Sequence, residues 1–129
     1  MKYFLGIFLF AVTIIQAQTS CINYSQINTE TRFVLVVDVS GSMSGQPLQD
    51  AKAGLKTFVN KMESSDLASL ISFNTSVTVS CQMTNKKEDL SEVIDALEAG
   101  GGTHIYDAVA KAVEMCKGYE ENSAVVLFT

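Results

Sequence analysis

The sequence predicts an α/β fold, built on a doubly wound, mostly parallel sheet with one antiparallel edge strand. Apolar stretches of strand length alternate along the chain with stretches whose apolar residues have helical spacing, as in doubly wound sheets. In the first predicted strand, Arg32–Val37, a continuous apolar run indicates a parallel strand covered on both faces. Ser76–Ser80 instead alternates polar and apolar residues. The short Asn74-Thr75 joint before it indicates a hairpin, and hence the antiparallel edge.

The remaining elements follow in chain order. Pro47 suits the first turn of a helix after the first strand, and the apolar residues that follow it fall on one helical stripe. Leu67–Phe73 and Ala124–Phe128 are predicted as further buried strands, with two helices between Ser80 and Ala124. The apolar positions of the three helices are Leu48, Ala51, Leu55, Phe58, Val59 and Met62, then Leu90, Val93, Ile94 and Leu97, then Ile105, Ala108, Val109, Ala112, Val113 and Cys116.

The first 17 residues have the features of a secretory signal peptide. Lys2 gives a basic start, residues 4–15 are almost wholly apolar, and Ala17 offers a small residue for cleavage. The apolar stretch is short for a membrane span, so no membrane insertion of this chain is expected. We therefore predict a secreted, extracellular protein with a signal peptide over residues 1–17, a polar lead-in over residues 18–31 and one domain over residues 32–129.

The composition limits the partners and leaves the cysteines unassigned. The formal net charge is −5, and this acidity argues against binding to nucleic acid or to an anionic membrane surface. Three cysteines, Cys21, Cys81 and Cys116, leave at least one unpaired within the chain. Cys116 falls on the apolar face of a helix and is expected to be buried. The partner of Cys21 is either Cys81 or a residue outside the chain.

Polar side chains follow the first strand at the point where it ends. In Asp38-Val39-Ser40-Gly41-Ser42, a carboxylate and two hydroxyls stand at alternate positions, and in an extended segment these side chains point the same way. The carboxyl end of a parallel strand is also where open α/β sheets bind ligands. Hard oxygen donors suit Mg²⁺, with Mn²⁺ or Ca²⁺ possible, rather than zinc or copper. The sequence therefore predicts a cation site that contains Asp38, Ser40 and Ser42.

This pentapeptide resembles the Asp-x-Ser-x-Ser motif that opens the metal-ion-dependent adhesion site of the von Willebrand factor A domain family. A later family loop carries a threonine, and Gly100-Gly101-Gly102-Thr103 is similar to it. The resemblance covers residues 31–129 and implies the family's α/β fold, with Thr103 as a further metal ligand. The family also has an aspartate directly after a buried strand. We expect that residue after Thr129, in a longer protein of which this chain is a C-terminally incomplete part.

Other interpretations of the same residues stay open. Serine, glycine and aspartate are also common in plain turns. Thr103 could instead cap the helix that begins near His104, and Asp107 could favour that helix N-terminus. Two other motifs are excluded: an EF-hand loop from Asp38 would need glycine at Met43 and glutamate at Gln49, and a hydrolase elbow would need serine at Met43. His104 is the sole histidine, so it is interpreted as a rim residue rather than a catalytic one.

The resemblance implies a function in binding rather than catalysis. In the family, the single carboxylate leaves the cation positively charged, so that an acidic residue of a protein partner can complete its coordination. We therefore expect a secreted, non-enzymatic module that binds an extracellular protein through a divalent cation. The alternative is a module of a larger membrane-associated protein, such as a chloride-channel regulator or a calcium-channel auxiliary subunit.

Overall fold

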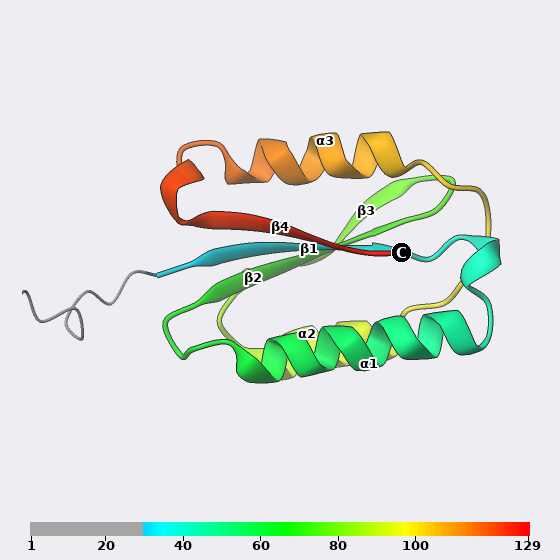
Figure 1. The fold of residues 1–129 in the computed structure, drawn as a ribbon, viewed down its shortest axis with the longest axis horizontal. Helices are drawn as coiled ribbons and strands as arrows, with labels where there is room; N and C mark the ends of the chain where they lie inside the picture. Colours follow the sequence, from blue (N-terminus) through cyan, green and yellow to red (C-terminus); the bar gives the residue numbers. More distant parts are fainter. Residues whose placement is uncertain (1–29) are drawn as a thin grey trace, which may run out of the picture.

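Residues 30–129, the part of the chain that this computed structural model describes, form a four-stranded sheet with helices on both faces. Helices α1 and α2 cover one face and α3 covers the other (Figure 1). The predicted signal peptide, most of the lead-in and Cys21 lie outside the described residues. The elements are β1 (Arg32–Asp38), η2 (Gly41–Met43), α1 (Gln46–Lys61), β2 (Leu67–Phe73), β3 (Val77–Thr84), α2 (Lys87–Asp95), α3 (Ile105–Cys116), η3 (Glu120–Asn122) and β4 (Ser123–Phe128).

The sheet has the strand order β3-β2-β1-β4. Strand β1 pairs in parallel with both β2 and β4, and β3 pairs with β2 in the antiparallel sense, so the predicted fold class is confirmed. The predicted end of β3 is wrong, because the strand continues past Ser80 to Thr84. Cys81 and Met83 still pack against the two sides of the core, and register shifts opposite Leu70 break the simple alternation.

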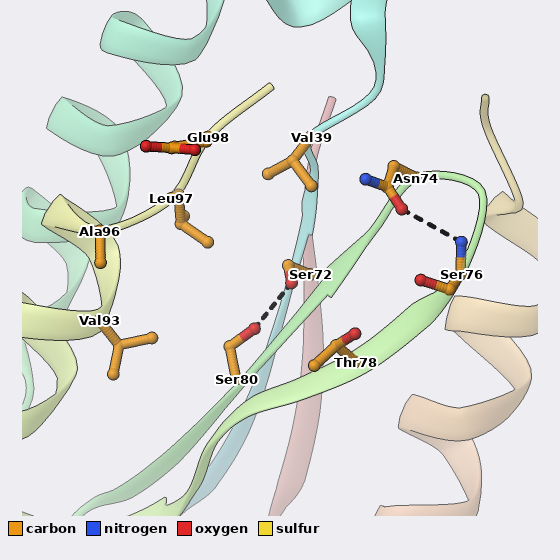
Figure 2. Close-up of a pocket in the computed structure, with 10 residues that line it drawn as sticks. All are labelled: Val39, Ser72, Asn74, Ser76, Thr78, Ser80, Val93, Ala96, Leu97 and Glu98. Atoms are coloured by element: carbon orange, nitrogen blue, oxygen red, sulfur yellow. Dashed lines mark hydrogen bonds between the residues drawn. The ribbon is translucent and has the colours of Figure 1, made fainter. Parts of the chain in front are cut away.

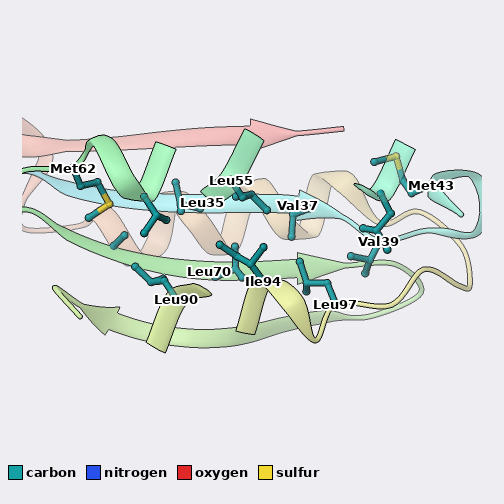
Figure 3. Packing of buried hydrophobic residues seen from close by; sticks show 13 residues of the cluster. Leu35, Val37, Val39, Met43, Leu55, Met62, Leu70, Leu90, Ile94 and Leu97 are labelled. Carbon is teal, nitrogen blue, oxygen red and sulfur yellow. The ribbon is translucent and has the colours of Figure 1, made fainter. Parts of the chain in front are cut away.

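The two faces of β1 supply two separate parts of the core. Leu35 and Val37 pack in the cluster beneath α1 and α2 (Figure 3), whereas Val34 and Val36 pack in the cluster beneath α3. All four side chains are fully buried. A strand covered on both sides must be apolar at every position, which explains the continuous run in the sequence.

The predicted helices are present. Pro47 lies in the first turn of α1, and Leu48, Leu55 and Val59 of its stripe are buried. Helix α2 begins at Lys87, three residues before its first predicted apolar position, and buries Leu90 and Ile94. The two short 3₁₀ turns, η2 and η3, are not predicted by the apolar spacing. No helix within residues 30–129 combines the length and the apolar character that a membrane crossing requires.

The two described cysteines carry free thiols within this part of the chain. Burial raises the pKa of the Cys81 thiol, and the nearby negative charge of Asp89 raises it further. Cys116 is only partly buried, so the expectation of a buried thiol is wrong. It is the last residue of α3, whose buried residues are Ala108 and Ala112. The pairing of Cys21 stays open.

Candidate metal centre

The first half of the centre is the segment that leaves β1. Asp38 is the last residue of this strand, and its side chain is 5% exposed; Ser40 is 1% exposed. The Ser40 backbone N–H donates a hydrogen bond of 2.8 Å to Asp38 Oδ1. This local bond fixes the carboxylate at the carboxyl edge of the sheet, where the fold places ligand sites.

The two predicted serine ligands lie together. Ser40 Oγ and Ser42 Oγ are 3.0 Å apart. Ser42 belongs to the 3₁₀ turn Gly41–Met43, so the expectation of an extended segment through Ser42 is wrong. The turn itself brings the two hydroxyls within hydrogen-bond distance. Ser42 is exposed to solvent, in contrast to Ser40.

The buried Asp38 carboxylate has hydroxyl and amide partners. Thr129 Oγ1 donates to Asp38 Oδ2 at 3.2 Å, and the Ser40 N–H occupies the other oxygen. Within residues 30–129, the ion pairs involve other acidic residues, and no lysine, arginine or histidine pairs with Asp38. A buried carboxylate without a positive partner is costly, so a cation at this position would stabilise it.

The second half of the centre is the loop Gly100–His104, which two backbone hydrogen bonds join to the first half. Gly100 N–H donates to Val39 O at 2.8 Å, and Gly41 N–H donates to Gly101 O at 2.9 Å. The structure thereby places the loop that carries Thr103 beside the loop that carries Ser40 and Ser42. The four predicted ligands thus come from two adjacent loops.

Thr103 itself is exposed, and its hydroxyl has no hydrogen-bond partner in the described part of the chain. The N-cap position of α3 is His104, and no side chain caps that helix end, so the capping role considered for Thr103 is wrong. Asp107 lies in the first turn of α3, as the sequence suggested. The hydroxyl of Thr103 is therefore available to a ligand.

Sequence reasoning missed two residues at the tip of the β2–β3 hairpin. Thr75 Oγ1 accepts a hydrogen bond of 2.8 Å from Gly102 N–H, and Asn74 O accepts one of 2.9 Å from His104 N–H. His104 Nδ1 also lies 3.0 Å from Asn74 O. The Asn-Thr pair signals only a turn in the sequence, since its contacts are with residues far along the chain.

The donor set fits a hard divalent cation. One carboxylate and up to three hydroxyl oxygens match the oxygen preference of Mg²⁺, Mn²⁺ and Ca²⁺. Within residues 30–129, no group of three or more histidine, cysteine, aspartate or glutamate side chains gathers as a metal site. A cation at Asp38 would therefore depend on neutral oxygens and keep most of its charge.

A cleft adjoins the exposed serine. It lies between α1 and the end of β4, has a volume of about 660 Å³ and is lined at one end by Ser42. Its other lining residues are mostly apolar, with one carboxylate, and are Met43, Pro47, Asp50, Ala51, Leu127, Phe128 and Thr129.

The sequence profile of the von Willebrand factor type A domain matches residues 33–129. The chain belongs to this family. The A domain is 34% identical over 90 residues to human inter-alpha-trypsin inhibitor heavy chain H4, covering 64% of the chain. It is 32% identical over 99 residues to an uncharacterized Synechocystis protein, covering 74% of the chain. The chain spans 24% of the Synechocystis relative and 9% of the human one.

Solved structures agree with the family assignment. The three N-terminal domains of the type V pili tip protein Mfa5 from Porphyromonas gingivalis align with a TM-score of 0.70 and 25% identity, covering 76% of this chain and 19% of that one. A von Willebrand factor type A protein from Catenulispora acidiphila shares the fold with a TM-score of 0.59 and 20% identity, over 65% of this chain and 22% of that one. A domains are generally non-enzymatic modules that bind protein partners.

Proposed function

We propose that this A domain binds an acidic side chain of a protein partner through a divalent cation, with Mg²⁺ the first choice, held by Asp38, Ser40, Ser42 and Thr103. The observation that carries the proposal is the buried Asp38 carboxylate, which has no positive partner within residues 30–129 and lies at an edge lined with hydroxyls. The bound cation would supply a positive centre with a coordination position open to a carboxylate.

The four proposed ligands differ in charge and in exposure, and so in their roles at the cation. Asp38 provides the single negative charge, fixed by the Ser40 N–H, and so attracts the cation without neutralising it. Ser40, almost fully buried, provides a neutral oxygen from the protein side. Ser42 and Thr103 are exposed and lie toward solvent, where a partner approaches.

The extracellular location remains part of the proposal. It is supported by the signal-peptide features of residues 1–17 and by the likeness to a pilus tip protein. The chain matches only a small part of each of these relatives, which favours a module within larger proteins. The same cation-dependent contact would serve the alternative, a module of a membrane-associated assembly.

A panel of peptides with a central glutamate, each paired with its glutamine counterpart, tests the proposal on the full chain. Binding is measured by fluorescence anisotropy in Mg²⁺ and in excess chelator. We expect glutamate peptides to bind in Mg²⁺ and to lose binding in chelator, in the glutamine counterpart and with Asp38→Asn. Binding that survives in chelator, or equal binding of the two members of each pair, would remove the bridging role and leave an ordinary protein interface.

A further inference from the structure

We propose that Thr75, at the tip of the β2–β3 hairpin, is a positioning residue of the candidate metal centre. Its hydroxyl holds the Gly100–His104 loop in the conformation that presents Thr103 to the cation. Thr75 is not expected to touch the cation, and its effect is transmitted through the backbone of Gly102. The inference rests on the proposed function, because it concerns the same site.

The hydrogen bonds on either side of Thr103 carry the argument. Gly102 N–H donates to Thr75 Oγ1 at 2.8 Å, and His104 N–H donates to Asn74 O at 2.9 Å. Both chain neighbours of Thr103 are therefore attached to the hairpin tip. The side chain of Thr103 is exposed and has no hydrogen bond of its own in residues 30–129. Its position is thus set by its neighbours and, through them, by the hairpin.

The loop also packs closely against Thr75. Gly101 has a φ of +81°, and a Cβ atom at this position would lie 2.6 Å from Thr75 Oγ1. On its other side, Gly101 O accepts the hydrogen bond from Gly41 N–H. The loop is therefore held between Thr75 and the segment that follows Asp38, and a shift at Thr75 would move it relative to the carboxylate.

The hairpin tip is itself well fixed. Asn74 Oδ1 accepts a hydrogen bond of 3.1 Å from Ser76 N–H, and Ser72 Oγ lies 2.7 Å from Ser80 Oγ across the two strands (Figure 2). Because the Asn74 side chain closes the turn, its backbone oxygen is free to accept from His104. Strand β2 also joins the first half of the site directly, since Phe73 O accepts from Val39 N–H.

Two matched substitutions at Thr75 test the proposal in the full chain. Thr75→Val removes the hydroxyl but keeps the branched shape, whereas Thr75→Ser keeps the hydroxyl; Thr75→Ala is a second removal variant. Thr78→Val, at an exposed threonine of the same hairpin, is the control. The first readout is amide hydrogen exchange of Gly102 in chelator, followed by NMR. The second is Mg²⁺ affinity, measured by calorimetry.

Losing one hydrogen bond to the loop should speed Gly102 exchange by about five- to tenfold in the valine and alanine variants and weaken Mg²⁺ binding by about the same factor. The serine and Thr78→Val variants should behave like wild type. Unchanged exchange in the valine and alanine variants would overturn the proposal, as would faster exchange with unchanged Mg²⁺ affinity. A wild-type chain that binds no Mg²⁺ would instead overturn the proposed function, while the exchange result would still decide whether Thr75 holds the loop.

Discussion

The two loops of the candidate centre are built in different ways. The segment after β1 is buried at Asp38 and Ser40, which are bonded to each other, and it also bonds to distant parts of the chain. The loop before α3 is exposed, and its hydrogen bonds reach residues far away in the sequence, from Gly102 to Thr75 and from His104 to Asn74. The first half thus has a local bond that fixes a buried carboxylate, whereas the loop before α3 is exposed and depends on tertiary bonds, so substitutions in the two halves should have different effects.

Asp38→Asn should have the largest effect, because it removes the only charge of the buried half. Mg²⁺ at about 100 times its dissociation constant should raise the free energy of unfolding of the wild type by about 2.7 kcal/mol. The variant should gain nothing, while its stability in chelator should be unchanged or higher, because a buried unpaired charge is lost. Urea unfolding of the full chain measures both values. Asp89→Asn, at an exposed position, is the control, and equal Mg²⁺ stabilisation of Asp38→Asn would contradict the assignment.

Gly101→Ala tests the exposed half and should have the next largest effect. The φ of +81° disfavours any side chain there, and the new Cβ would collide with Thr75 Oγ1 at 2.6 Å. We expect a loss of about 1–2 kcal/mol in the free energy of unfolding, together with weaker Mg²⁺ binding. Gly100→Ala is the matched control, because a Cβ at Gly100 meets nothing within 4 Å. Equal results for the two variants, in unfolding and in calorimetry, would mean that the loop is not held as described.

Comparison of Ser40→Ala with Ser42→Ala should reveal a smaller difference within the first half. Water can replace the hydroxyl of exposed Ser42 more easily than that of Ser40, which is 1% exposed. We expect Ser40→Ala to weaken Mg²⁺ binding by about 1 kcal/mol and Ser42→Ala to weaken it by less. Calorimetric titration of the two variants measures the difference, and the reverse order would show that Ser42 provides the more important oxygen.

The sequence predicts most of the fold because its signals are local. The continuous apolar run of β1, the stripe of α1 and the hairpin before β3 each depend on neighbouring residues, and each is confirmed. The end of β3 is mispredicted because the irregular pairing opposite Leu70 breaks the alternation beyond Ser80. Periodicity within one strand carries no information about its partner's register.

At the site, too, the residues in a local motif are predicted from the sequence and the long-range contacts are not. The motif from Asp38 to Ser42 predicts a cluster that the structure forms, although Ser42 reaches it through a 3₁₀ turn rather than an extended segment. Thr103 is found through its glycine-rich loop, but its anchors at Asn74 and Thr75 are not, since they lie almost 30 positions earlier in the chain. Contacts of this kind appear only when the chain is folded.

Paramagnetic broadening by Mn²⁺ tests most directly whether one cation lies between the two loops. In NMR spectra of the full chain, substoichiometric Mn²⁺ should broaden the amide signals of both segments, Ser40 and Gly41 on one side and Gly102 and Thr103 on the other. Excess Mg²⁺ should restore these signals, and Asp38→Asn should abolish the broadening. Broadening centred on the acidic residues of α2, or broadening that Asp38→Asn leaves unchanged, would contradict the assignment of the site.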